Sequence, residues 1–463
     1  MAFLTEAANR GSISTGYDID NSVKLDGNNN ERIARASNTI GTPTNAKIAT
    51  LSFWAKRSAL KSDNAHFSFI ANAGAASTYI CFEQDKARVY TTGGNSLSSN
   101  ALFRDTSAWY HFVAAFDMTQ GTASNRVKIY INGVQITSFS TETYGTQNND
   151  IGLYDTNMTH YFGYAGSQGW FGYIAEAHLI DGQQLAPTEF GEFDSSGIWK
   201  PKEYDGTYGD EGYYLDFEDS SNLGLDVSGN SNNFGALYAI TAVDQATDTP
   251  TNNFCTFNAV NMSGSSATLA EGATFTASTA NGAFTTYGTM APSSGKWWWE
   301  GKIQVFESGS TYACIGATTN LAGLPSVSAQ ISGGHVIKLA KAQKWVVNDT
   351  GYSYGAAYSD ADIINVGLDL DNRKFYTYKN GTIDDANGID ISSTTFDGFG
   401  SQWMPLVITY GSGGASSYEI NFGGYRTYGI GSPESDENGY GTFEYAPPSG
   451  YYALCTKNLE EYG

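Results

Sequence analysis

The stretch Ile364 to Gly381, INVGLDLDNRKFYTYKNG, indicates the fold class, because it reads as two strands and two turns. Aliphatic residues alternate with small or polar ones up to Asp371, and a period of two is that of a β-strand with one apolar face. A turn at 371–374 leads into the β-preferring run FYTY at 375–378. Asn380-Gly381 then favours the positive φ angles of a tight hairpin turn. The stretch predicts an antiparallel hairpin followed by a second chain reversal.

The first half of the chain repeats this plan at 125–133, NRVKIYING. Val127, Ile129 and Ile131 alternate with other residues before an Asn-Gly turn. Two halves that each contain such a meander predict an all-β protein built from two antiparallel β-sandwiches in series.

The composition agrees with an all-β chain of several domains. At 463 residues the chain exceeds one ordinary core, and roughly two to three domains are expected. Glycine is abundant, and no long stretch repeats an apolar residue with helical spacing. The formal net charge of -22 opposes binding to nucleic acid or to an anionic membrane surface. We therefore expect neither as a partner.

The cysteines and the N-terminal residues indicate the cellular compartment in which the protein is made. Cys81, Cys255, Cys314 and Cys455 are far apart, without a C-x-x-C pair or a His at ligand spacing. Reduced, packed thiols are expected rather than a zinc site or a disulfide framework. MAFLTEAANRGS lacks a basic region followed by an apolar one, and no run of about 18 apolar residues could span a membrane. We expect synthesis in a cytoplasm, with no signal peptide and no membrane insertion.

Five segments, taken in order, resemble the laminin-G-like, concanavalin A-like jelly-roll family. They are SVKLDG (22–27), TLSFWAK (50–56), WYHFVAAFD (109–117), VKIYING (127–133) and GWFGYIAEAHLIDGQQL (169–185). The last is similar to the closing strand of those domains. The resemblance covers about residues 20–195, and 213–217 reads as one more strand of the same unit, so we expect a jelly roll at 21–219. Residues 1–20 are small and polar with little pattern and are expected to form an N-terminal arm.

The second half resembles a SPRY domain, another sandwich of antiparallel sheets. The matching segments are GKWWWE (295–300), CIGA (314–317), YSYG (352–355) and the stretch 362–381. Trp298 and a Gly- and Ser-rich loop at 320–334 depart from the pattern. The resemblance implies a SPRY sandwich at 261–445. A turn-rich but partly apolar stretch at 220–260 is expected to be a packed connector, and 446–463 a C-terminal tail.

Three other segments resemble parts of large SPRY-containing proteins of marine bacteriophages. They are FGEFDSSGIWKPKEYDG (190–206), TPTNNFCTFN (249–258) and PPSGYYALCTKNL (447–459). The resemblance implies a virion protein such as a tail fibre, a receptor-binding protein or a capsid decoration protein, with other virion proteins as partners. Several copies would convert weak contacts into avidity, so a homo-oligomer is expected.

One carboxylate pair has the spacing that glycoside hydrolysis requires. Asp216 and Glu218 would share a strand face about 6.6 Å apart, within the roughly 5–9 Å that flanks a scissile sugar bond. The E-x-D-x-E strand of hydrolases in this family is absent, however, and 219–221 reads as a strand end. His111 and His178 lie in apolar strands, where packed histidines are expected. We therefore expect no catalytic residues and no enzyme, and a polysaccharide depolymerase is the less favoured alternative.

Calcium is a candidate ligand, because lectin-like domains often hold it through loop oxygens. The candidates by residue type are Asp150, Asp155, Asn157, Asp181 and the loop at 28–31. No spacing resembles an EF-hand, and each Asp is more typical of a turn residue than of a calcium ligand. We assign no metal and no cofactor.

The aromatic residues divide into core and loop candidates. Those inside apolar alternation should be core: Trp54, Trp109, Phe171, Trp297, Trp299 and Phe375. Others lie beside Gly, Asn, Ser or Asp, as loop aromatics do: Tyr144, Tyr154, Trp170, Tyr208, Tyr352, Tyr354 and Tyr358. Ring faces that stack on sugars, with short polar groups nearby, suit a neutral glycan. The alternative is that these loops only pack on themselves.

The predicted ligand-binding residues are Tyr352, Tyr354, Tyr358, Asp360, Trp170 and Tyr154. The first four would lie at the end of the sandwich where SPRY domains recognise ligands. Our first hypothesis is a non-enzymatic protein displayed on a virion that binds a host-surface carbohydrate or a neighbouring virion protein. The alternative is a cementing protein whose N-terminal arm or C-terminal segment docks into neighbouring subunits.

Overall fold

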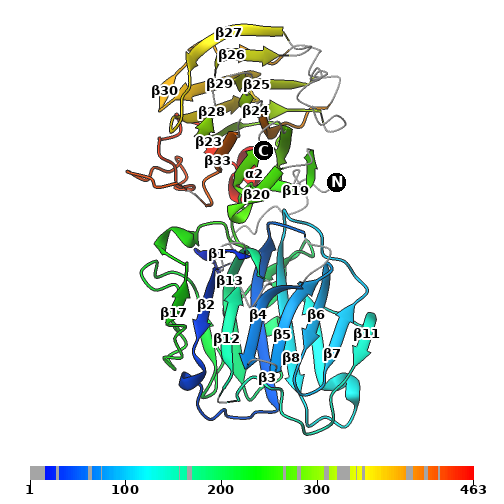
Figure 1. Ribbon diagram of the computed structural model, residues 1–463. Helices are drawn as coiled ribbons and strands as arrows, with labels where there is room; N and C mark the ends of the chain where they lie inside the picture. The colour runs from blue at the N-terminus through cyan, green and yellow to red at the C-terminus, as the bar shows by residue number, and fades with distance from the viewer. Residues whose placement is uncertain are drawn as a thin grey trace. The chain divides into compact units, whose positions relative to one another are not determined.

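The computed structural model describes residues 16–27, 31–60, 65–73, 76–155, 157–163, 169–263, 267–278, 283–306, 312–320, 334–339, 341–346, 350–392, 400–410, 416–425 and 428–463. Contacts divide the chain into an N-terminal unit, Ser12–Thr251, and a C-terminal unit that contains Asn252–Gly463 (Figure 1). The stretch expected as a connector is therefore shared: 220–251 belongs to the N-terminal unit and 252–260 to the C-terminal unit.

The N-terminal unit contains two large antiparallel sheets. Sheet 1 has the order β10 (Val134–Gln135), β9 (Val127–Ile131), β8 (Trp109–Asp117), β3 (Ile48–Arg57), β13 (Phe171–Asp181), β1 (Ser22–Asp26) and β18 (Gln245–Ala246), and β16 (Tyr213–Leu215) also pairs with β13. Sheet 2 has the order β11 (Phe139–Thr143), β7 (Ser96–Ser99), β6 (Lys86–Tyr90), β5 (Ala76–Glu83), β4 (Ala65–Ala73), β12 (Thr159–Gly163), β2 (Arg32–Arg35) and β17 (Ala236–Tyr238). A separate hairpin joins β14 (Gly191–Phe193) to β15 (Trp199–Pro201).

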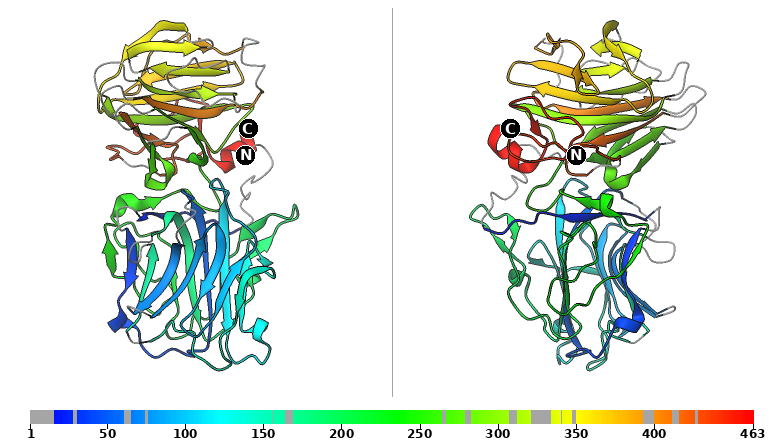
Figure 2. Two further views of the ribbon diagram at one scale, coloured as in Figure 1. Left: turned by 45° about the vertical axis from the view of Figure 1, so that its right-hand side comes forward. Right: turned by 90° about the vertical axis from the view of Figure 1, so that its left-hand side faces the viewer.

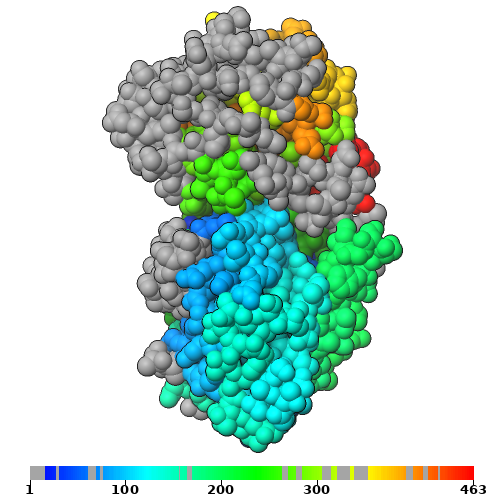
Figure 3. All heavy atoms as spheres, turned by 90° about the vertical axis from the view of Figure 1, so that its right-hand side faces the viewer, coloured from blue at the N-terminus to red at the C-terminus, as the bar shows by residue number. Residues whose placement is uncertain are grey.

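The core of the N-terminal unit lies between its two sheets, which appear as layers of strands in Figure 2. Phe53 of β3 stacks on Phe112 of β8 with ring centroids 5.6 Å apart, and Phe162 of β12 meets Phe53 edge-on at 6.3 Å. Alternate residues of both sheets thus fill one apolar layer. Strand β11, in the cyan part of the chain in Figure 3, is the edge strand of sheet 2, and its residues 140–143 are exposed.

The C-terminal unit also contains two large sheets. Sheet 3 has the order β19 (Phe257–Ser263), β22 (Ala283–Gly288), β32 (Met404–Tyr410), β24 (Tyr312–Thr318), β25 (His335–Leu339), β26 (Lys341–Val346) and β27 (Thr350–Ala357). Sheet 4 has the order β20 (Ala267–Ala270), β21 (Phe275–Ser278), β33 (Ser416–Asn421), β23 (Lys296–Phe306), β28 (Ile363–Asp369), β29 (Lys374–Lys379) and β30 (Thr382–Ile383). Two short strands join it: β31 (Ile389–Asp390) pairs with β29, and β34 (Tyr452–Ala453) pairs in parallel with β23.

The hairpin expected at 364–381 is confirmed. β28 and β29 pair antiparallel with Leu368 opposite Phe375. Asn380 and Gly381 have φ angles of 48° and 77°, and the chain then returns as β30. Every residue of β28 is buried. The face of the strand that carries its polar and small residues is covered by Tyr451, whose ring would lie 3.0 Å from a Cβ on Gly367. The C-terminal tail therefore packs on its own unit.

Helices are few in the part of the chain that the structure describes. The one α-helix there is α2 (Thr456–Tyr462), and the short 3-10 helices are η2 (Ser37–Thr39), η3 (Ala123–Asn125), η4 (Pro187–Glu189), η5 (Ala242–Asp244) and η6 (Glu271–Ala273). None of the described helices combines the length and hydropathy needed to cross a bilayer. The four cysteines are thiols rather than halves of disulfides, and all are buried. The all-β prediction is confirmed.

Candidate functional site

Two of the predicted ligand residues lie inside the core of the N-terminal unit. Tyr154 is 6% exposed and Trp170 is fully buried, and both belong to the apolar cluster between the sheets. Trp170 packs against Phe82 with ring centroids 6.0 Å apart. Both residues lie outside the strands, as expected of loop aromatics, but their rings pack into the core because the neighbouring glycines mark turns at its edge. Neither ring offers a face to a sugar.

The predicted cluster in the C-terminal unit is not an exposed loop either. Tyr352 and Tyr354 belong to strand β27, although the side chain of Tyr352 lies outside the described residues. Tyr354 and Tyr358 are 5% and 3% exposed, and the Tyr358 hydroxyl donates a 2.5 Å hydrogen bond to Asp384. Of the four, Asp360 is exposed. The rings therefore belong to the apolar core of the C-terminal unit, which corrects the expected stacking platform.

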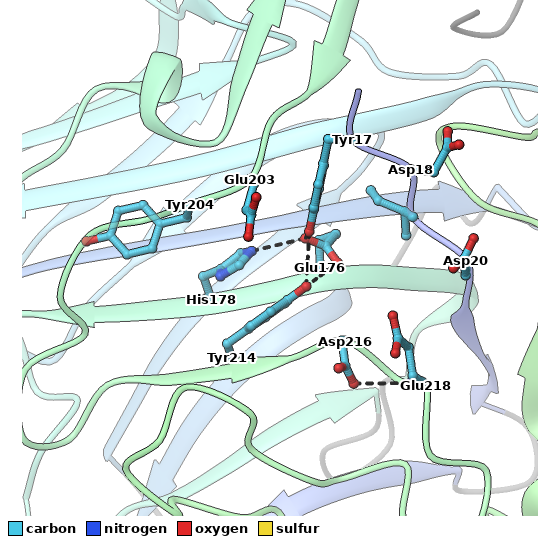
Figure 4. Close-up of a pocket in the computed structure, with 11 residues that line it drawn as sticks. Tyr17, Asp18, Asp20, Glu176, His178, Glu203, Tyr204, Tyr214, Asp216 and Glu218 are labelled. Carbon is cyan, nitrogen blue, oxygen red and sulfur yellow. Dashed lines mark hydrogen bonds and ion pairs between the residues drawn. The ribbon is translucent and has the colours of Figure 1, made fainter. Parts of the chain in front are cut away.

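The carboxylates Asp216 and Glu218 instead line a cavity of about 250 Å³ in the N-terminal unit, which we call the Glu176 pocket (Figure 4). Its lining residues are Tyr17, Asp18, Ile19, Asp20, Glu176, His178, Glu203, Tyr204, Tyr214, Asp216 and Glu218. They come from four places in the chain: the segment before β1, strand β13, the loop before β16, and β16 with the residues that follow it. Because β13 pairs with both β1 and β16, the sheet brings these segments together.

A bulge in β13 positions the central residue of the pocket. The register with β3 shifts between Ala175 and His178, and Glu176 adopts a φ of 49°. The extra residue allows Ile174 and Ala177 both to join the core cluster, so Glu176 and His178 point away from it. A non-glycine residue held at positive φ stores strain of about 1–3 kcal/mol, which the surrounding structure must offset.

Hydrogen bonds hold the Glu176 carboxylate in place. The Tyr17 hydroxyl donates to Oε2 at 2.6 Å, and the Tyr214 hydroxyl donates to Oε1 at 2.7 Å. His178 Nε2 lies 3.4 Å from Oε2, and its Nδ1 lies 3.0 Å from the Tyr208 hydroxyl. His178 also stacks on Tyr214 with ring centroids 4.3 Å apart. Since each phenol uses its hydrogen on Glu176, its oxygen keeps lone pairs that can accept a hydrogen bond from a ligand.

The pocket is acidic, and burial alters the ionisation of its members. Burial and the nearby Glu176 carboxylate raise the pKa of Tyr17 and Tyr214, so both phenols stay protonated donors. Burial, with a further contribution from Glu176, also raises the pKa of Asp216, and burial and the Asp216 carboxylate raise that of Glu218. None of the described lining residues is Lys or Arg. The site therefore suits a ligand that donates hydrogen bonds and carries no negative charge.

Metal binding finds little support among the candidates that the sequence suggested. No group of three His, Cys, Asp or Glu residues within the described ranges could hold a metal ion. The Asp181 carboxylate accepts hydrogen bonds from the backbone N–H groups of Thr44, Asn45 and Glu211, so it acts as a turn residue. Glu31 binds the buried Lys24 ammonium at 3.0 Å. Residues 28–30 lie outside the described residues, and Asn157 is exposed.

Sequence reasoning missed the centre of the pocket. Glu176 and His178 occur in the quoted segment 169–185, but strict alternation conceals a bulge. His178 was expected to be a packed histidine, and it is buried at 4% exposure, but on the side of the sheet away from the core. His111 is a packed histidine: Trp199 donates to its Nδ1 at 3.0 Å, and burial lowers its pKa to about 3.

Comparisons with known proteins gave a match to one family model and, among others, to three solved structures. A laminin-G family model, described as the concanavalin A-like lectin/glucanases superfamily, matches residues 26–189. The SPRY domain of human HERC1 is 15% identical and covers 34% of this chain and 92% of its own, with a TM-score of 0.28. A human SPRY domain is 13% identical, with coverages of 34% and 96% and a TM-score of 0.26. The heptameric SAP-like pentraxin from Limulus polyphemus is 15% identical, with coverages of 37% and 80% and a TM-score of 0.27. A search of curated sequences found no match.

Proposed function

We propose that this chain, which contains a concanavalin A-like domain at residues 26–189, is a non-enzymatic virion protein of a bacteriophage that binds a neutral host-surface glycan through the Glu176 pocket. The observation that carries the glycan assignment is the pocket itself. It combines half-buried tyrosine rings with a carboxylate fixed by two phenols. Sugar sites use the same combination of apolar ring faces and a few placed hydrogen-bonding groups.

The chemistry of the pocket restricts the class of glycan. Carboxylates and phenol oxygens accept hydrogen bonds from sugar hydroxyls, whereas uronic acids, sialic acids and sulfated sugars would be repelled by Asp216, Glu218 and Glu176. The net charge of -22 opposes the approach of a polyanion over longer distances as well. The favoured ligand is therefore an uncharged oligosaccharide that inserts one residue into the pocket.

The virion part of the proposal rests on sequence resemblance. The segments at 190–206, 249–258 and 447–459 resemble connector and terminal pieces of phage proteins. A pocket of about 250 Å³ holds only a small part of a polysaccharide, so single contacts are weak. Display of several copies, in a homo-oligomer bound to other virion proteins, would supply the avidity that cell attachment needs.

The test is binding of the purified full-length chain to neutral and anionic bacterial polysaccharides, each with and without a calcium chelator. Glu176→Gln and Tyr214→Phe should each weaken binding to a neutral glycan by at least about tenfold, since each removes a hydrogen bond that orients the pocket. Tyr238→Phe is the matched control, because Tyr238 is 44% exposed on β17 of the other sheet. Equal binding by all variants would move the site elsewhere. Absence of binding throughout would favour a cementing role in the particle.

A second candidate function, polysaccharide hydrolysis, is favoured by one observation. Asp216 and Glu218 lie in the same pocket as Glu176, and raised pKa values at the first two suit a carboxylic acid that donates a proton. Against it, both oxygens of Glu176 are occupied by phenols, and Glu218 is exposed. Release of reducing sugar ends by the purified protein, lost in Asp216→Asn, would establish the hydrolase.

A further inference from the structure

The N-terminal segment at 16–20 covers the Glu176 pocket with a tyrosine. Figure 4 shows Tyr17 extending from this segment onto Glu176, on the opposite side from Tyr214. Its hydroxyl lies 2.6 Å from Glu176 Oε2 and 3.1 Å from the Tyr214 hydroxyl. The side chain thus occupies the position in which a ligand hydroxyl could reach the same carboxylate.

Hydrogen bonds at Ile19 and Ser22 hold this segment against residues 248–251. Thr251 Oγ1 accepts from the Ile19 N–H at 3.0 Å and donates to the Ile19 carbonyl at 2.9 Å, and the Ser22 hydroxyl donates to the Asp248 carbonyl at 2.6 Å. Ile19 is 4% exposed, whereas Gly16 and Asp18 are exposed. Gly16 has a φ of 116°, and a Cβ there would meet no atom within 4 Å. The chain is therefore anchored at Ile19 and Ser22, and the Tyr17 side chain is held by the contacts of its hydroxyl with Glu176 and Tyr214.

We infer that Tyr17 is an internal competitor for the ligand: its phenol hydroxyl imitates a sugar hydroxyl on Glu176 and leaves when the glycan enters. The inference rests on the proposed function. A glycan hydroxyl would take over the hydrogen bond to Oε2, while Tyr214 continues to hold Oε1. Only molecules in which Tyr17 has left Glu176 can bind the glycan. The apparent dissociation constant for the glycan therefore equals the intrinsic constant divided by the fraction of molecules in this open state.

This arrangement predicts that removal of the competitor strengthens binding. Tyr17→Ala should bind a neutral glycan about tenfold more tightly than the wild-type chain, and Tyr17→Phe, which keeps the ring but not the hydroxyl, should lie between them. The probe is the neutral oligosaccharide that gives the strongest signal with wild-type protein, or with Tyr17→Ala if the wild-type signal is absent. Glu176→Gln in the Tyr17→Ala background should remove the gain. Thermal unfolding checks that each variant is folded.

The outcomes separate the two proposals. Tighter binding by Tyr17→Ala, together with more oxidation of the Tyr17 ring in the glycan-bound wild-type chain by hydroxyl-radical footprinting, supports the competitor. Equal or weaker binding by Tyr17→Ala, with protection of the Tyr17 ring by glycan, would show that Tyr17 clamps the ligand and would overturn the inference while leaving glycan binding intact. If neither the wild-type chain nor Tyr17→Ala binds any neutral glycan, the proposed function is wrong. The inference about Tyr17 is then wrong as well, because removal of its side chain has exposed no glycan site.

Discussion

Lys56 Nζ lies 2.6 Å from Asp248 Oδ2, and both side chains are 1% exposed. Trp109 Nε1 donates to the other carboxylate oxygen of Asp248 at 3.1 Å. The segment that ends the N-terminal unit is thus tied to β3 and β8 of sheet 1, residues far away in the sequence. A charge pair in a dry interior stabilises a fold only while both partners remain, because either one alone is a desolvated charge.

The first prediction concerns this pair. Asp248→Ala should lower the free energy of unfolding of the N-terminal unit by about 3–5 kcal/mol, since the Lys56 ammonium loses its carboxylate in a buried site. Urea unfolding monitored by tryptophan fluorescence measures the change. Asp205→Ala, at an exposed position, is the control. The double variant Lys56→Met with Asp248→Leu should recover most of the loss, and a double variant as unstable as Asp248→Ala would contradict the argument.

The C-terminal unit also contains a buried side-chain carboxyl group, that of Glu300. It is fully buried on β23. Its Oε1 accepts from Asn365 Nδ2 at 3.0 Å and from the Tyr445 N–H at 2.9 Å. Its Oε2 accepts from the Tyr428 hydroxyl at 3.0 Å and the Glu444 N–H at 2.9 Å. One backbone donor therefore faces each carboxylate oxygen.

The second prediction follows from these donors. In Glu300→Gln the side-chain NH2 group faces a backbone N–H, and two donors cannot form a hydrogen bond with each other. The C-terminal unit should therefore lose about 1–3 kcal/mol of stability. Denaturant unfolding reports the loss. Glu437→Gln is the matched control, because Glu437 is exposed. Equal stability of the two variants would show that the Glu300 contacts contribute little.

The third prediction concerns the pH dependence of the same residue. Burial raises the pKa of Glu300 to about 7, above the ordinary glutamate value of 4.5. A raised folded-state pKa means that its contribution to stability is fully present below about pH 4.5 and is lost as the pH rises through about 7. The stability difference between the wild-type chain and Glu300→Gln should therefore shrink from pH 5 to pH 8, as measured by unfolding at each pH. A difference that grows over this range would reverse the sign of the argument.

The fourth prediction concerns a residue first expected to bind a ligand. Trp170→Ala should lower the stability of the N-terminal unit by about 3–5 kcal/mol, because it leaves a cavity among Phe82 and its neighbours in the core. Thermal or urea unfolding measures this loss. The exposed Leu102→Ala, at 46% exposure, should change stability little. A stable Trp170→Ala protein would mean that the indole is not packed as described.

The fold could be predicted from sequence wherever alternation and turn chemistry agree. The hairpin at 364–381 and the central strand Trp109–Asp117 are both confirmed, since their apolar patterns and flanking turns are local properties. The core positions of Trp54, Trp299 and Phe375 are also confirmed. In each case the information lies within a few consecutive residues.

The candidate site could not be predicted in the same way, because it depends on contacts between distant segments. Tyr17 and Glu176 are 159 residues apart, and Glu176 reaches the pocket only through a bulge that the alternation conceals. Glycine beside an aromatic residue was equally misleading. At Tyr154 and Trp170 it marks a turn over the core, and local composition does not distinguish such a turn from an exposed loop.

The last prediction concerns Gly172, which lets β13 approach β3 closely. Its φ is 138°, and a Cβ there would lie 1.9 Å from the Lys56 carbonyl oxygen and 3.0 Å from the Ser58 nitrogen. Both neighbours are backbone atoms, so Gly172→Ala must force the strands apart. We expect a loss of at least about 3 kcal/mol in the unfolding free energy, from overpacking and an unfavourable φ together. Gly121→Ala, with no atom within 4 Å of its Cβ, should leave stability nearly unchanged. If Gly172→Ala proved as stable as that control, β13 and β3 could not lie at this spacing, and the bulge that presents Glu176 would need a different register.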